Sequence, residues 1–290
     1  MSLIDDLKLQ FRMGDVTTKL IFWNVLFFAI PEVVFAFLQL SNIHINYLYY
    51  ISLSSNPSEL LWKPWSLISY NFFHAGIWHL IFNMLMLSFA GRLFLTFFTQ
   101  KQLLGLYLTG GIFAGGIYIL CYMFFPALVN INASLIGASA AIMCILFATV
   151  SYSPTMPVRL LIFGNVKLWH IALVLVFVDL ISLPANNTGG HLAHLGGAFF
   201  GYIYIWQLKS GRDLSKWVSA VLDLFDSSQK APFKKVHKNY RKPETKKASK
   251  IVTKDKAQQQ IDEILDKISR SGYDSLTKEE KEFLFRAGKQ

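Results

Sequence analysis

The sequence predicts an all-α, polytopic membrane protein in which six transmembrane helices form one bundle and a small helical tail follows in the cytoplasm. Hydrophobic residues make up 53% of the 290 residues, charged residues only 16%, and phenylalanine occurs 25 times. Such a composition is typical of membrane proteins and excludes an ordinary soluble enzyme. One crossing needs about 20 apolar residues, and six suitable runs lie between positions 20 and 208.

The six runs are expected to cross at 20–40, 67–98, 103–125, 134–152, 168–183 and 190–206. The first run has no Ala-x-Ala cleavage pattern after it, which favours a spanning helix over a removed signal. The second run is too long for one crossing, and Ala75-Gly76 is its weakest helical point. We therefore expect its helix to start near Gly76 and leave 41–75 as a large, aromatic external loop at the membrane interface.

Charge divides the chain into an apolar body and a basic tail. Residues 1–208 contain 8 Lys/Arg and 6 Asp/Glu, whereas residues 209–290 contain 20 and 12. Basic residues precede the first run and follow the fourth, while the loops at 126–133 and 184–189 carry no charge. By the positive-inside rule, both termini are predicted in the cytoplasm, with the chain in the inner membrane if the source is bacterial.

These boundaries predict a cytoplasmic N-terminus (1–19), a six-helix membrane domain (20–208), a basic linker (209–260) and a C-terminal helical hairpin (261–290). Within the linker, Leu214–Phe225 has the pattern of an amphipathic surface helix. Residues 227–260 hold eleven Lys/Arg against two acidic residues and are predicted to be disordered. Attraction to anionic lipid explains this charge, so we expect no nucleic-acid partner. In the hairpin, Thr277-x-x-Glu280 is a capping box.

Four polar residues lie where a bilayer makes them costly: His79, Asn83, Ser139 and His194. His79 and Asn83 share one helix face because they are four residues apart. Helical rise places the two roughly 5 and 10 Å below the outer end of their helix, and Ser139 and His194 each roughly 8 Å below theirs. The sequence therefore predicts that all four meet in one shallow layer near the outer surface.

Each of these residues alone has an ordinary structural explanation, such as a hydrogen bond within or between helices. Together they suit hydrolysis. Burial favours the neutral histidine that a general base requires, and such a base activates a serine. Amides at the start of the serine helix, with His79 and Asn83, could stabilise an oxyanion. Only a third triad member is lacking.

Small residues indicate that the two helices approach closely. Ser139 lies in a run of small side chains that includes Gly137, and His194 is followed by Gly197 and Gly201 on the same face. Such small-xxx-small surfaces let membrane helices pack backbone against backbone. We therefore expect these three glycines to serve helix packing.

Taken together, the motifs resemble those of rhomboid intramembrane serine proteases. Gly137-Ala138-Ser139-Ala140 is similar to the family's GxSx motif, His74-Ala75 with His79 and Asn83 to HxxxxHxxxN, and Ala193-His194 with Gly197 and Gly201 to AHxxGxxxG. The resemblance covers about residues 20–208 and matches the six-helix bacterial form.

The resemblance implies a nucleophilic Ser139, a basic His194, and an oxyanion hole formed by His79, Asn83 and the Ser139 amide. It also implies that the fifth span is a lateral gate and that substrates are transmembrane proteins. The chain departs from the family at Ser66, where an arginine is frequent, and at Ala140, where many members have glycine.

Alternative functions have weaker support. Four histidines, at positions 74, 79, 191 and 194, could form a metal site, but the chain has no HExxH motif and we expect no carboxylate near them. Asp179 is the only acidic residue between Lys63 and Asp213, so an aspartyl protease, which needs two, is excluded. A transporter would favour two repeated halves, and the sequence shows no convincing internal repeat. A non-catalytic rhomboid-like protein that binds transmembrane clients stays open. We expect neither cofactor nor metal, and the oligomeric state is not predicted.

Overall fold

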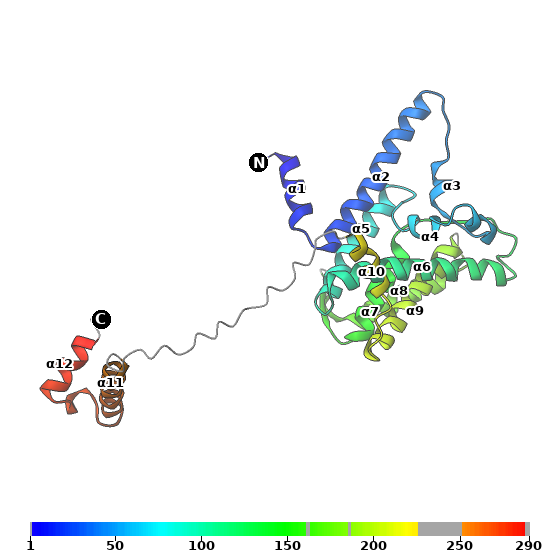
Figure 1. Cartoon of the computed structure of the whole chain (residues 1–290). Helices are drawn as coiled ribbons and strands as arrows, with labels where there is room; N and C mark the ends of the chain where they lie inside the picture. The colour runs from blue at the N-terminus through cyan, green and yellow to red at the C-terminus, as the bar shows by residue number, and fades with distance from the viewer. Residues whose placement is uncertain (1, 161–162, 185–186, 226–250, 288–290) are drawn as a thin grey trace. The chain divides into compact units, whose positions relative to one another are not determined.

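The structure, a computed structural model, describes residues 2–160, 163–184, 187–225 and 251–287 (Figure 1). These form two compact units, which meet in sequence between Gln229 and Lys230. Most of the predicted disordered linker lies outside the described residues, as do positions 185–186 of an uncharged loop and 288–290 of the hairpin.

The first unit is mainly helical. Its elements are α1 (Leu3–Met13), α2 (Val16–Leu40), α3 (Tyr47–Ile51), β1 (Leu53–Ser54), the 3₁₀ helix η1 (Pro57–Leu61), α4 (Ser66–Ser69), α5 (Ile77–Leu95), α6 (Gln100–Phe124), β2 (Ser134–Leu135), α7 (Ser139–Tyr152), β3 (Pro157–Leu160), β4 (Gly164–Lys167), α8 (Leu168–Ser182), α9 (Thr188–Lys209) and α10 (Lys216–Phe225).

Helix α7 lies at the centre of this unit. Residues 140–146, 148 and 149 are all buried, so the helix is covered on every side, as an all-apolar helix in a large core must be. Helices α5, α6 and α9 pack around it. In contrast, α2 buries only Thr17, Leu20 and Asn24 and exposes most of its apolar side chains. An exposed apolar helix of this kind is suited to lipid.

Three helices in the described part of the chain are long and apolar enough to cross a membrane: α2, α5 and α6. The prediction that the second helix starts near Gly76 is confirmed, because Gly76 is the N-cap of α5. Helices α7 and α8 have 14 and 15 residues, shorter than a full crossing by themselves. The chain is thus an α-helical membrane protein. That it crosses the membrane six times stays a prediction.

Two short antiparallel sheets correct the all-α prediction. Strands β1 and β2 pair Leu53 with Leu135 and Ser54 with Ser134, which ties the loop between α2 and α5 to the segment before α7. Because Ser134 and Leu135 are in this sheet, α7 begins at Ser139 and not at Ser134 as predicted. Strands β3 and β4 form a second hairpin between α7 and α8.

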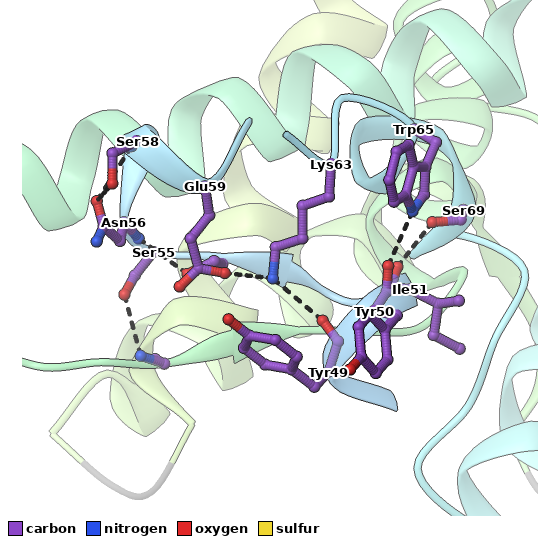
Figure 2. Close-up of polar contacts among 12 residues, drawn as sticks. Tyr49, Tyr50, Ile51, Ser55, Asn56, Ser58, Glu59, Lys63, Trp65 and Ser69 are labelled. Carbon is purple, nitrogen blue, oxygen red and sulfur yellow. Dashed lines mark hydrogen bonds and ion pairs between the residues drawn. The ribbon is translucent and has the colours of Figure 1, made fainter. Parts of the chain in front are cut away.

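The loop between α2 and α5 is held by a buried lysine, whose polar contacts Figure 2 shows. Lys63 is 1% exposed and forms an ion pair with Glu59, and its Nζ donates to the Tyr49 carbonyl over 3.1 Å. The same ammonium lies 4.2 Å from the centre of the Tyr49 ring. Ser55 joins the loop to the segment before β2, because its hydroxyl donates to the Ile131 carbonyl over 3.0 Å. The loop is thus anchored by a lysine, although position 66 has serine where the proteins it resembles often have arginine.

Helix α10 lies against α6. The Trp217 indole donates to Thr109 over 2.9 Å, and Lys101 pairs with Asp223 at 3.1 Å. The predicted amphipathic helix over Leu214–Phe225 is confirmed, although it starts two residues later. An additional amphipathic helix, α1, occupies the predicted N-terminal segment.

The second unit contains α11 (Ile251–Ser271), the 3₁₀ helix η2 (Tyr273–Ser275) and α12 (Lys278–Ala287). Two helices thus occupy the region of the predicted hairpin, but the first begins ten residues before the predicted Ile261, within the expected linker. Helix α11 ends before Gly272, whose φ of 78° suits glycine. The predicted capping box is present, because Thr277 and Glu280 bond reciprocally at 2.7 and 3.3 Å.

Candidate active site

The segment before α7 turns sharply at Gly137. Its φ is +122°, and an added Cβ would lie 2.7 Å from two atoms of the His79 ring. Its N–H donates to the Tyr70 carbonyl over 2.9 Å. Gly137 was predicted to pack helices. Instead it lies before the helix, where the absence of a side chain lets the backbone rest against His79.

Helix α9 packs on α7 through two glycines. A Cβ at Gly197 would lie 2.1 Å from the Ala140 carbonyl oxygen, and one at Gly201 would lie 2.3 Å from that of Cys144. These contacts leave no space for any side chain, as the small-xxx-small pattern led us to expect. One turn before Gly197, the same face of α9 carries His194 toward the start of α7.

The structure brings Ser139 and His194 together. His194 Nε2 lies 2.6 Å from Ser139 Oγ, a hydrogen-bond distance. Ser139 is the first residue of α7, so its own N–H has no carbonyl one turn earlier to bond. The sequence placed Ser139 further inside its helix, whereas the structure places it at the N-terminal end. At this end the backbone amides are free and the helix dipole favours negative charge.

Asp179 of α8 completes a chain of three polar groups, and sequence reasoning missed it. Its Oδ1 lies 2.9 Å from Nδ1 of His194 and 2.7 Å from Nδ1 of His191. The expectation that no carboxylate lies near these histidines is wrong. Helices α8 and α9 pack together, which brings Asp179 into contact with histidines 12 and 15 residues later in the sequence. The available signal was a single acidic residue inside an apolar helix, which generally marks function.

His79 and Asn83 line the same cavity as Ser139 and His194. Asn83 Nδ2 donates to the His79 carbonyl over 2.8 Å, which leaves its second amide hydrogen for another acceptor. The His79 ring lies edge-on to that of His74, with centroids 5.2 Å apart. Burial, with the neighbouring His79 imidazole, lowers the pKa of His74 to about 3, so this loop histidine is neutral.

The cavity has a volume of about 640 Å³, within the range of binding sites for small ligands or peptide segments. Its walls come from α5, α7, α8 and α9, and most of its lining is apolar. Phe82 of α5 and Val178 of α8 line it and are also 63% and 45% exposed. The cavity therefore has an apolar side between α5 and α8.

Among the described residues, the ligand atoms of Asp179, His191 and His194 lie within 4.8 Å of one another. His74 and His79 do not belong to this group, so the described residues do not bring together the four histidines considered from the sequence. Both imidazoles contact one carboxylate oxygen directly, and His194 uses its other nitrogen for Ser139. These contacts match a hydrogen-bonded chain that ends at a serine hydroxyl.

Fold and site together define an α-helical membrane protein with a serine–histidine pair beside a partly apolar cavity. The rhomboid domain model matches residues 61–211, more than half of the chain, and the protein belongs to the rhomboid family. A second model, described as a family of unknown function (DUF6576), matches residues 252–289 and so the second unit.

Curated relatives include presenilin-associated rhomboid-like protein A, mitochondrial, of Danio rerio. It is 29% identical over 165 residues, which are 56% of this chain and 41% of that protein. The presenilin-associated rhomboid-like protein, mitochondrial, of Rattus norvegicus is 28% identical over 205 residues, 64% of this chain and 48% of that protein. The chain thus spans less than half the length of these relatives.

Proposed function

We propose that this protein is an intramembrane serine endopeptidase that cleaves transmembrane substrates near the outer membrane face. The single observation that carries the proposal is the 2.6 Å contact between Ser139 Oγ and His194 Nε2 beside the cavity. A serine is a weak nucleophile until a base accepts its proton, and this contact supplies the base.

In the first step, Ser139 Oγ bonds to the substrate carbonyl carbon while His194 Nε2 takes the hydroxyl proton. Collapse of the tetrahedral intermediate breaks the C–N bond, and His194 returns the proton to the leaving amine. Water then attacks the acyl-enzyme with His194 again as base, which releases the acid and restores Ser139. The side chain of His194 is 23% exposed, so water has access to it.

The oxyanion is stabilised by the free Ser139 N–H and by side-chain donors from His79 and Asn83. All three residues line the cavity, and donors fixed before the reaction stabilise developing charge effectively. Asn83 retains one amide hydrogen for this purpose after its bond to the His79 carbonyl.

The proposed topology has six spans, α2 and α5 to α9, with both termini on the cytoplasmic side and in the inner membrane for a bacterial source. Basic residues near the termini and between α7 and α8 support this orientation. Substrates enter between α5 and α8, where cavity residues are also exposed. Labelling of single cysteines from either side of the membrane tests the orientation, and an external C-terminus would contradict it.

The decisive experiment compares the purified wild type with Ser139→Ala on labelled transmembrane reporters in lipid vesicles. Ser151→Ala is the matched control, since this residue lies on the same helix and only bonds back to the Phe147 carbonyl. Cleavage should persist in the control and fall about 10³-fold or more in Ser139→Ala. A glycine-containing reporter should be cut faster than one with a stable helix, because its peptide bonds are less shielded.

Equal cleavage by wild type and Ser139→Ala would contradict the proposal. If neither protein cuts any reporter while both bind it, the alternative function holds, namely a rhomboid-like protein that binds transmembrane clients without cleavage. The apolar wall between α5 and α8 suits such binding as well.

A further inference from the structure

We infer that Asp179 is a positioning residue that fixes the tautomer and orientation of His194, so that the site works as a triad whose third member lies on α8. This inference rests on the proposed function. It goes beyond a serine–histidine pair because the orienting group belongs to a different helix from both members of the pair.

The hydrogen-bond network determines the tautomer. An ionised carboxylate only accepts hydrogen bonds, and Asp179 Oδ1 contacts Nδ1 of both His191 and His194. Both Nδ1 atoms therefore carry hydrogen. This leaves the lone pair of His194 on Nε2, the atom that faces Ser139 Oγ. The opposite tautomer would present an N–H to the serine and could not accept its proton.

The environment explains why Asp179 remains ionised and fixed. Asp179 is only 5% exposed, and burying a carboxylate without hydrogen-bond partners costs much free energy. Two Nδ1–H donors satisfy the same oxygen, so His191 acts as a second donor that holds the carboxylate in place. His191 itself has no contact with Ser139 among the described hydrogen bonds, which separates its contribution from that of His194.

Asp179 also attaches the last part of α8 to α9. Only Leu168, Ala172 and Asp179 are buried in α8, and its neighbours Val178 and Leu180 are 45% and 49% exposed. Asp179 is thus the buried residue of α8 that lies nearest to the C-terminal end of the helix. A movement of α8 that admits substrate would also change the orientation of His194, so the position of α8 and the state of the base are coupled.

The test compares wild type, Asp179→Asn and the matched control Leu180→Ala in the same vesicles. An Asn amide can donate to His194 Nδ1 and so favours the wrong tautomer, for which a fall in kcat of about 10²–10⁴-fold is expected with KM little changed. Leu180→Ala changes an exposed neighbour of Asp179 that does not line the cavity, and it should keep kcat within about twofold of wild type. A kcat for Asp179→Asn within about twofold of wild type would overturn the inference.

Tautomers are measured separately by ¹⁵N NMR of labelled histidine in the inactive Ser139→Ala protein. The His194 signals should show a protonated Nδ1, and adding Asp179→Asn should change that pattern. An unchanged pattern would overturn the inference even if activity falls, since loss of structure alone would then explain the fall. Because this readout needs no turnover, a wild type that cuts nothing would reject the proposed function without deciding the tautomer.

Discussion

Gly197 and Gly201 set the distance between the two helices that carry Ser139 and His194. Carbonyl oxygens of α7 lie where their Cβ atoms would be, at 2.1 and 2.3 Å. In a membrane, where apolar side chains gain little from leaving lipid, such close backbone contact is a main source of helix association. The geometry of the site therefore depends on residues that have no functional groups.

Gly197→Ala should destabilise the protein by about 1–3 kcal/mol, the usual cost of overpacking, and should reduce cleavage strongly because α9 moves away with His194. Gly116→Ala is the matched control, since nothing lies within 4 Å of its Cβ position and alanine favours a helix. Thermal unfolding in detergent and reporter cleavage measure both effects. Equal behaviour of the two variants would contradict the assigned packing.

At this scale, part of the site could be predicted from sequence. Spacing and depth placed Ser139, His194, His79 and Asn83 around one cavity, because helix geometry fixes such relations within each helix. The contact of Asp179 depends on which face of α8 turns toward α9, and apolar residues all round that helix conceal this face. Gly137 was misassigned because its turn, with a φ of +122°, is held by a bond to the distant Tyr70 carbonyl and rests against His79, neither of which the local sequence reveals.

At the scale of elements, the loop between α2 and α5 depends on the Lys63–Glu59 pair. Lys63→Met should destabilise the fold by about 3 kcal/mol, near the lower end of the range for breaking a buried pair, because the Glu59 side chain remains 21% exposed. Chemical unfolding monitored by circular dichroism measures this change. The double variant Lys63→Met, Glu59→Leu removes both charges and should recover most of the loss; no recovery would exclude an uncompensated carboxylate as the cause.

Asp213 attaches the start of α10 to α6. Partial burial opposes ionisation, but hydrogen bonds from Ser215 and Gln102 outweigh it and lower the pKa of Asp213 below its usual 3.8. The stabilisation is therefore present above about pH 3.8 and lost as pH falls through the lower folded value. Hydrogen exchange should show α10 amides losing protection below about pH 4. Asp213→Asn should already be less protected at neutral pH and change little on acidification; acid sensitivity equal to wild type would contradict this assignment.

The positions of the long helices followed from the sequence better than the loops did. Apolar length and Gly76 located α5, because a glycine preceding an apolar run is a reliable weak point. Strands β1 and β2 have two residues each, too few for any alternating pattern, and pair across about eighty positions of chain. Their pairing could only be found in three dimensions, and it moved the start of α7 by five residues.

At the scale of the whole molecule, the unit that carries the candidate site and the tail differ in charge and form separate compact units. The described part of the second unit has its own buried residues, Ile264 and Leu276, and its own ion pair between Lys267 and Glu280 at 2.9 Å. The residues of the candidate site all lie in the first unit, within the rhomboid match at 61–211. The tail over 209–290 has 20 basic and 12 acidic residues, and we expect this excess of positive charge to attract it to anionic lipid.

Deletion of residues 230–290, the whole second unit, should therefore leave reporter cleavage in neutral vesicles within about twofold of wild type. In vesicles with anionic lipid, the full chain should bring its tail to the surface, where each basic residue contributes about 1 kcal/mol at most. Protease protection of the tail measures this binding, and it should disappear at high salt. A tenfold loss of cleavage in neutral vesicles after the deletion would show instead that the second unit acts on the site itself.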